Sequence, residues 1–105
     1  MIITLTQDNF ESVINNLEKP VVVEFFSPTC SHCKMTEVGL LELSNENPDI
    51  AVYASCDITK EEALAKRFDI TALPTLLFIK NGDMKNKLTG FTHKLIISEE
   101  IKKLL

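Results

Sequence analysis

The sequence predicts an α/β fold: a central mixed β-sheet with helices on both faces. Apolar runs rich in β-branched and aromatic residues alternate along the chain with segments whose apolar residues recur at helical spacing. The run over residues 21–26 is apolar almost throughout, as is typical of a strand buried on both faces. Asn81-Gly82 is the strongest hairpin signal and makes one strand pair antiparallel. The expected order is β-α-β-α-β-α-β-β-α.

The N-terminal part is expected to form a strand and a helix. Residues 2–5 are a short apolar run, and Thr6 is the expected N-cap of the helix that follows. Pro20 ends this helix, because proline cannot continue a helical hydrogen-bond pattern. Its apolar positions are Phe10, Val13, Ile14 and Leu17.

A buried strand over residues 21–26 and a helix over residues 33–46 are expected next. Glu24 is the one carboxylate in this otherwise apolar strand. The helix is expected to turn inward the apolar residues Val38, Leu40 and Leu41.

The second half is expected to continue the alternation. A strand over residues 50–56 precedes a helix in which Thr59 is the predicted N-cap and Glu62 completes a capping box. The apolar stripe of this helix is Leu64, Ala65 and Phe68. Strands over residues 75–80 and 87–89 follow. The last helix has its apolar positions at Ile97, Ile101 and Leu104.

The composition indicates one globular domain over residues 1–105, long enough for one core but not for two. The net charge of −4 and the pI of about 5.1 argue against nucleic acid as a partner. The start, M-I-I-T-L-T-Q-D, lacks the features of a secretory signal, and no stretch approaches the ~20 apolar residues of a membrane span. We therefore expect a cytoplasmic monomer without a membrane partner.

Two cysteines, Cys30 and Cys33, lie where the buried strand over residues 21–26 gives way to a helix. At that junction the free N–H groups of the helix N-terminus favour a thiolate on the first cysteine. A residue three positions later lies on the same helical face, close enough to form a disulfide. We therefore expect Cys30 to be an exposed nucleophile and Cys33 the covered thiol that resolves a mixed disulfide.

A structural staple and a metal site are the alternatives for this pair. Three cysteines are an odd number, which disfavours a disulfide-stapled fold. Four metal ligands could be counted from Cys30, Cys33, Cys56 and either His32 or His93, but no second close-spaced ligand pair exists. We therefore expect no metal and no cofactor. Cys56 is expected to be a small buried hydrophobe, and His93 a capping or surface residue of the last helix.

Two further residues are expected to tune the cysteines. His32 adjoins both sulfurs, and stabilising the Cys30 thiolate would make the pair a stronger oxidant, although an exposed histidine without effect is the alternative. Burial of Glu24 should raise its pKa and make it a proton acceptor for Cys33. The alternative for Glu24 is a carboxylate that reaches water at a strand end.

Four segments of the chain together resemble the thioredoxin family, in the family's order and at its spacings. They are L-T-Q-D-N-F, V-V-V-E-F-F-S-P-T-C-S-H-C-K, A-L-P-T-L-L-F-I-K-N-G and T-G-F. The similarity covers essentially the whole chain and implies a thioredoxin fold.

The resemblance also implies a substrate groove and a set of partners. Pro74 would be the family's cis-proline, and the backbone of Leu73 would pair with an extended substrate segment. Thr29 would be a further residue of the groove, and Gly90 would keep its opposite wall low. The implied partners are protein disulfides as substrates and a thioredoxin-reductase-like electron donor, with glutathione as the alternative donor. A binding module that uses the groove without redox turnover is the alternative outside enzyme chemistry.

The chain departs from the family near these sites. Ser31-His32 stands where thioredoxins typically carry glycine-proline, and Thr29 takes the place of the tryptophan before the first cysteine; the chain contains no tryptophan. The buried acid is Glu24 instead of aspartate, and Ser55 stands where many thioredoxins have a lysine facing it. The potential and the proton transfer of this pair are therefore expected to differ from those of a standard thioredoxin.

Overall fold

The computed structural model describes residues 1–16 and 18–105, so Leu17, an expected apolar position of the first helix, lies outside the described residues. Five strands and four helices follow one another in the expected order. The strands are β1 (Ile3–Thr4), β2 (Val21–Phe26), β3 (Val52–Asp57), β4 (Thr75–Lys80) and β5 (Asp83–Thr89). The helices are α1 (Phe10–Ile14), α2 (Ser31–Glu46), α3 (Glu62–Arg67) and α4 (Lys94–Lys102).

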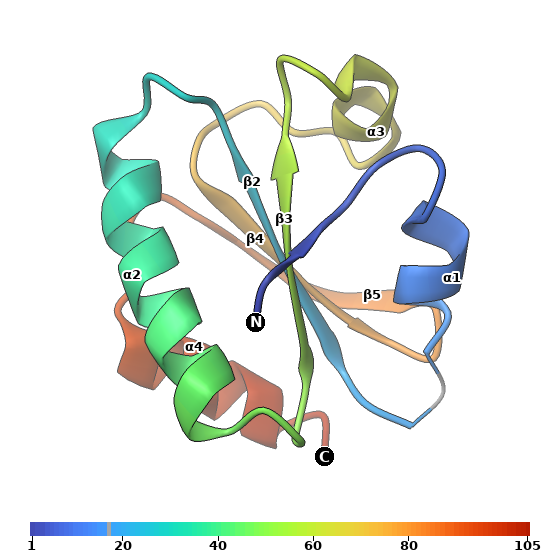
Figure 1. The fold of residues 1–105 in the computed structure, drawn as a ribbon, viewed down its shortest axis with the longest axis vertical. Helices are drawn as coiled ribbons and strands as arrows, with labels where there is room; N and C mark the ends of the chain where they lie inside the picture. Colours follow the sequence, from blue (N-terminus) through green and yellow to red (C-terminus); the bar gives the residue numbers. More distant parts are fainter. Residues whose placement is uncertain (17) are drawn as a thin grey trace.

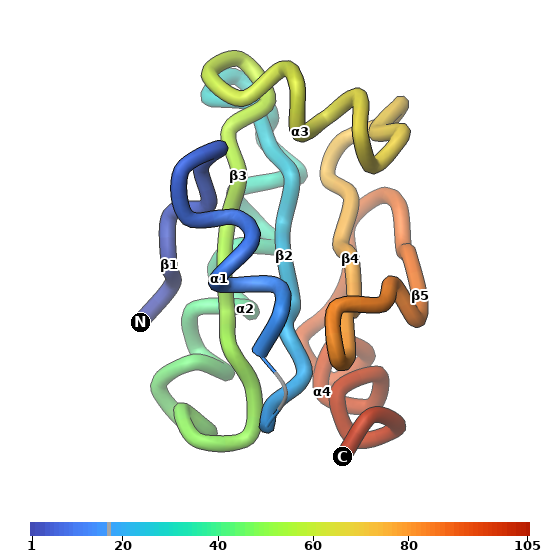
Figure 2. Tube along the Cα trace, turned by 90° about the vertical axis from the view of Figure 1, so that its right-hand side faces the viewer, coloured from blue at the N-terminus to red at the C-terminus, as the bar shows by residue number. Residues whose placement is uncertain are grey.

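The strands form one mixed sheet in the order β1-β3-β2-β4-β5, and Figure 2 shows them side by side in this order. β1, β3 and β2 run parallel, whereas β4 is antiparallel to β2 and β5 is antiparallel to β4. Asn81 and Gly82 join β4 to β5 with φ values of 54° and 81°, the backbone that a two-residue hairpin turn requires. This turn pairs Lys80 with Asp83, so β5 begins four residues before the expected strand.

The helices cover both faces of the sheet, as the sequence predicts. α1 and α3 lie over one face and α2 and α4 over the other (Figure 1). The core under α1 and α3 includes Phe10, Val23, Phe25, Cys56, Leu64 and Leu77. The core under α2 and α4 includes Val22, Leu40, Tyr53, Phe78, Ile97 and Ile101. No helix within residues 1–16 and 18–105 is long and apolar enough to cross a membrane.

The inward face of α2 differs from the expected one. Val38 and Leu41 are 59% and 44% exposed, so their predicted burial is wrong, whereas Leu40 is buried as expected. The buried positions of the helix are Cys33, Thr36, Leu40, Leu43 and Ser44. They follow the helical repeat from Cys33, and two of them are polar. A prediction from the apolar residues alone therefore gives an inward face of α2 that is rotated about the helix axis from the observed one.

Two of the predicted helix caps are also wrong. The N-cap of α1 is Asn9, while Thr6 exchanges hydrogen bonds with Asn9 in the turn before the helix. The N-cap of α3 is Glu61, because Thr59 is engaged elsewhere: its hydroxyl donates to the Asp57 carboxylate over 2.6 Å. In both places a polar side chain organises the preceding turn instead of the first turn of the helix.

His93 is the N-cap of α4, one of the two roles expected of it. Its Nδ1 accepts a hydrogen bond from the backbone N–H of Leu95 over 3.1 Å. The side chain of Lys94 continues from this end of α4 to the carboxylates of Glu42 and Glu46, at 3.1 and 3.0 Å. Gly39 allows the close approach, because a Cβ built there would meet the Lys94 Cβ at 3.0 Å. These ion pairs and this close packing hold the first turn of α4 against α2.

Candidate active site

The cysteine pair lies at the junction between β2 and α2. Cys30 is the N-cap of α2, and its sulfur accepts a hydrogen bond from the backbone N–H of Cys33 over 3.2 Å. The two sulfurs are joined in a disulfide, with the Cα atoms 5.2 Å apart. Cys30 is partly exposed, whereas Cys33 is 2% exposed. The pair therefore has one sulfur within reach of a partner and one covered sulfur.

The local backbone explains this arrangement. After β2 the chain turns at Ser27, whose carbonyl accepts the N–H of Cys30 over 3.2 Å. The helix then begins at Ser31, two residues before the expected start, so Cys30 stands at the helix N-terminus. There the free N–H groups and the helix dipole favour negative charge, which after reduction would be a thiolate on Cys30. The roles of nucleophile and resolving thiol stay predictions.

The other residues around the pair face solvent. His32 and Lys34 are exposed on the first turn of α2. Thr29 is exposed too, and its hydroxyl lies 3.5 Å from that of Ser27. The surface beside Cys30 is therefore polar at the position where thioredoxins typically carry a tryptophan.

The loop before β4 and the loop after β5 form the other side of the site. The Leu73–Pro74 peptide bond is cis, as the resemblance implies. The Pro74 carbonyl accepts a hydrogen bond from the backbone N–H of Gly90 over 2.8 Å, which holds the two loops together. Figure 1 shows the loop before β4 at the same end of the sheet as the start of α2. Three of the four predicted groove residues, Leu73, Pro74 and Gly90, are thus brought together, whereas no hydrogen bond joins Thr29 to them among the described residues.

Two features leave this surface accessible to another chain. Within the described residues, the N–H and C=O groups of Leu73 make no hydrogen bond. Gly90 has a φ of +85°, and a Cβ built on it would meet no atom within 4 Å. An extended segment of another chain could therefore approach Leu73 and pair with its backbone.

Glu24 is enclosed in the interior of the protein. It lies in β2 between Ser55 of β3 and Leu76 of β4, and it is 0% exposed. Neither carboxylate oxygen has a hydrogen-bond partner among the described residues. Burial raises its pKa to about 8, and the negative charge of Glu37 adds to the rise. A raised pKa caused by burial is what the sequence predicts for Glu24, and the alternative of a carboxylate that reaches water is wrong.

Glu37 is a residue that the sequence analysis missed. It is half-buried on α2, four residues after Cys33. The helical repeat counted from Cys33 would have placed it near the inward face. A glutamate in the middle of a helix usually lies on a solvated surface, so the residue type did not single out Glu37 as part of the site.

The remaining candidate ligands do not join the cysteine pair. Cys56 packs in the core under α1 and α3, across the sheet from α2. Burial raises its pKa to about 12, and the charges of Glu61 and Asp57 add to the rise. His93 is engaged as the cap of α4. Over residues 1–16 and 18–105, no three His, Cys, Asp or Glu side chains are grouped so that they could hold a metal ion.

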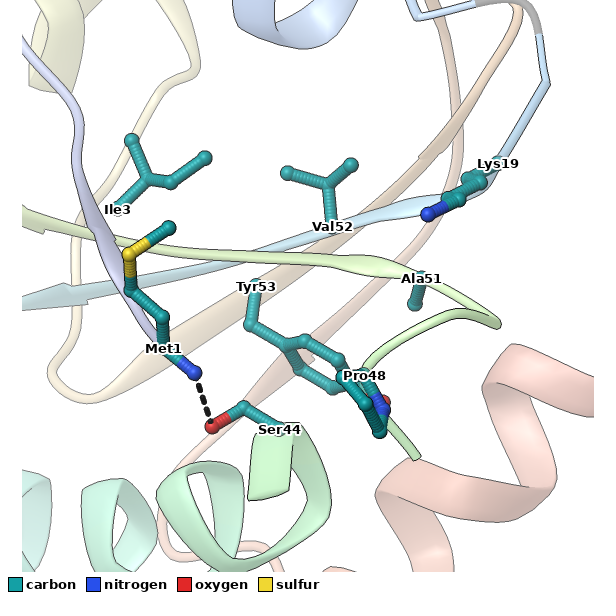
Figure 3. Close-up of a pocket in the computed structure, with 8 residues that line it drawn as sticks. All are labelled: Met1, Ile3, Lys19, Ser44, Pro48, Ala51, Val52 and Tyr53. Carbon is teal, nitrogen blue, oxygen red and sulfur yellow. Dashed lines mark hydrogen bonds between the residues drawn. The ribbon is translucent and has the colours of Figure 1, made fainter. Parts of the chain in front are cut away.

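A separate hollow lies at the opposite end of the sheet and is shown in Figure 3. Its volume is about 230 Å³, and the ammonium group of Met1 donates a hydrogen bond to the Ser44 hydroxyl there over 3.1 Å. Its lining residues are Met1, Ile3, Lys19, Ser44, Pro48, Ala51, Val52 and Tyr53. None of the predicted site residues lines it.

Comparison with known proteins gives one consistent result. A family model described as Thioredoxin matches residues 1–103. Protein disulfide-isomerase A4 of Mus musculus is 42% identical over 84 residues, which are 76% of this chain and 13% of that protein. Thioredoxin, mitochondrial, of Mus musculus is 33% identical over 97 residues, which are 92% of this chain and 58% of that protein. The chain thus spans only part of the length of these relatives.

Solved structures agree with the sequence comparison. Thioredoxin of Malassezia sympodialis superposes with a TM-score of 0.89 at 24% identity, covering 99% of this chain and 90% of that one. A chain from a study of thiol resolving in yeast mitochondrial 1-Cys peroxiredoxin via glutathione/thioredoxin systems superposes with a TM-score of 0.86 at 28% identity, covering 98% and 95%. With the family model matching nearly its whole length, this chain belongs to the thioredoxin family.

Proposed function

We propose that this protein is a thiol–disulfide oxidoreductase that reduces disulfide bonds in other proteins. The observation that carries the proposal is the asymmetry of the cysteine pair. Cys30 is partly exposed at a helix N-terminus and its sulfur accepts an N–H hydrogen bond, while Cys33 is covered. The backbone of Leu73, which has no hydrogen-bond partner within the described residues, would offer an extended substrate a place to pair.

The reaction starts from the dithiol form. The Cys30 thiolate attacks one sulfur of the substrate disulfide, so a Cys30–substrate disulfide forms and the other substrate sulfur leaves as a thiolate that takes up a proton from water. Cys33 then loses its proton and attacks the Cys30 sulfur. The second substrate sulfur leaves and is protonated in turn. The substrate gains two electrons and two protons, and the protein is left with the Cys30–Cys33 disulfide.

Glu24 is the proposed acceptor of the Cys33 proton. It lies on the same side of the sheet as α2, and its carboxylate has no hydrogen-bond partner among the described residues. The proton would pass to Glu24 directly or through one water. Because the pKa of Glu24 is about 8, its basic form grows as the pH rises towards 8, so the second step should accelerate over that range.

A glutathione-coupled version of the same chemistry is the second candidate. His32 supports it, because stabilisation of the Cys30 thiolate would raise the reduction potential of the pair. The reduction potential of the Cys30–Cys33 pair distinguishes the two candidate functions. It can be measured in glutathione buffers with thiol counting. A value near the ~−270 mV of thioredoxin supports a general reductant served by a reductase, and a value near ~−200 mV supports exchange with glutathione.

Trapping of substrates tests the proposal itself. In a Cys33→Ser variant the mixed disulfide cannot be resolved, so substrates should accumulate as adducts of Cys30 that are released by dithiothreitol. The double variant Cys30→Ser/Cys33→Ser is the matched control, because it keeps the groove and Cys56 but has no nucleophile. If both variants capture the same proteins equally, the chain is a binding module and the redox proposal is wrong.

A further inference from the structure

Glu24 faces the layer that contains α2 and α4. Along β2, Val23 and Phe25 belong to the core under α1 and α3, whereas Val22 belongs to the core under α2 and α4. Because side chains alternate along a strand, Glu24 lies on the side of Val22. Its carboxylate is therefore enclosed between the sheet and α2.

Within the described residues, nothing positive or hydrogen-bonded offsets a charge on Glu24. The neighbouring strands place Ser55 and Leu76 beside it, and neither of them titrates. Tyr53 shares this face, but its hydroxyl donates to the Asn47 carbonyl at the far end of α2.

The charged groups of α4 on this face are engaged elsewhere. Lys94 reaches the carboxylates of Glu42 and Glu46, and His93 caps its own helix. On α2, Glu37 is the group whose charge acts on Glu24, and Cys33 is a buried residue of the same helix.

Glu37 lies along the inward side of α2. It is four residues after the buried Cys33 and three before the buried Leu40, the spacings that put residues on one helical face. It is only half-buried, so its carboxylate keeps contact with water while its charge acts on the enclosed Glu24. Two like charges separated by poorly solvated protein repel strongly, because the medium screens them less than water does.

We propose that Glu37 is a positioning residue for the exchange reaction, and that its negative charge controls how readily Glu24 accepts the proton of Cys33. The proposal rests on the proposed function. With Glu37 ionised, Glu24 holds its proton, which it can give to the Cys33 thiolate when the protein disulfide is opened. For the same reason fewer molecules at neutral pH have the basic Glu24 that the closing step requires.

The test is the pH profile of the closing step in Glu37→Gln. A single-turnover reduction of a protein disulfide would be followed between about pH 6 and pH 9. Loss of the Glu37 charge should move the midpoint of the Glu24-dependent part of the pH–rate profile to lower pH by roughly half a unit to one unit. Below the midpoint, the rate of the closing step should then rise by about 3- to 10-fold. Glu37→Lys should move it further in the same direction, and Glu37→Asp should restore the wild-type midpoint. Glu46→Gln is the control: it makes the same charge change at the far end of α2.

A second measurement does not depend on turnover. The titration of the Glu24 carboxyl carbon, followed by NMR in the oxidised protein, should shift in Glu37→Gln as the rate profile does. An unshifted Glu24 titration overturns the inference. A shifted titration with an unmoved rate profile also overturns it, because Glu37 then has no part in the reaction. Failure of the proposed function is distinguishable, since the wild-type protein would then show no turnover at any pH.

Discussion

The backbone N–H of Cys33 donates a hydrogen bond to the sulfur of Cys30 over 3.2 Å. This donor belongs to the backbone of α2, so reduction of the disulfide does not remove it. After reduction the same N–H faces a sulfur that is free to ionise, and hydrogen bonds to a charged group are roughly twice as strong as neutral ones. The start of the helix therefore favours the reduced, ionised form of Cys30 whatever side chains surround it.

Replacement of His32 by proline should raise the thiol pKa of Cys30 and make the reduction potential of the pair more negative. A positive charge near the sulfur would stabilise the thiolate, but His32 is exposed, so water and salt keep the shift small. The measurement is the pH dependence of alkylation of Cys30 in a Cys33→Ser background. His32→Gln removes the ring and keeps the backbone N–H. Unchanged titrations in both variants would show that His32 is an exposed residue without effect.

Replacement of Glu24 by glutamine should stabilise the oxidised protein at neutral and alkaline pH. The folded-state pKa of about 8 lies above the ordinary value of 4.5, so the native state binds more protons than the unfolded state between these values. The free energy of unfolding of the wild type should therefore fall as the pH rises from about 4.5 to 8, by about 1.4 kcal/mol per pH unit and by a few kcal/mol in all.

Urea unfolding of both proteins at about pH 5 and pH 8 measures this difference. The free energy of unfolding of Glu24→Gln should not fall over this pH range. The variant should therefore be more stable than the wild type only at the higher pH. Glu11→Gln, an exposed acid of α1, should keep the wild-type slope. Parallel curves for the wild type and Glu24→Gln would mean that Glu24 does not hold its proton in the folded state.

Replacement of Gly90 by alanine should lower stability by about 1 kcal/mol, because a residue with a Cβ is strained at a φ of +85°. The added methyl would meet no atom of the chain within 4 Å, so it would project into the space proposed for the substrate. Reduction of a protein disulfide should slow, while reduction of a small-molecule disulfide should not. Gly82→Ala introduces a similar backbone strain, at φ +81°, in the hairpin away from the cysteines, and its Cβ would also displace the Asn15 side chain. This control should leave the ratio of the two reduction rates unchanged.

Replacement of His93 by alanine should lower the free energy of unfolding by about 1 kcal/mol, the usual cost of losing an N-cap. The imidazole accepts the N–H of Leu95, and alanine has no acceptor there. His93→Asn supplies a capping oxygen and should restore most of the loss. Equal stabilities of the alanine and asparagine variants, measured by chemical unfolding, would show that the hydrogen bond contributes nothing.

The sequence predicted the order of the elements, because strand runs, helical spacing and the Asn81-Gly82 turn give independent local signals. It failed on the inward face of α2, since Thr36 and Ser44 are buried while Val38 is exposed. Tertiary packing decides such positions, and residue type does not. It failed on the caps for a similar reason, because a threonine can bond to the turn before a helix as well as to the helix.

In the site, too, features with a local sequence signal were predicted, and features that depend on tertiary packing were not. The position of the cysteines at a strand–helix junction and the carboxylate of Glu24 in an apolar strand were visible as departures from a local pattern. The cis bond before Pro74 and the open Gly90 followed from the family resemblance. Glu37 could not be singled out, because its effect on Glu24 arises only when α2 lies against the sheet.

Alkylation of Cys56 can be used to detect unfolding of the core under α1 and α3. In the native state the sulfur is 0% exposed and its pKa of about 12 leaves almost no thiolate at neutral pH, so alkylating reagents cannot reach or react with it. Once the core under α1 and α3 opens, its thiol becomes ordinary and is labelled. The rate of labelling of Cys56 in the oxidised protein therefore reports how often that core opens, in a chain without tryptophan to signal the event by fluorescence.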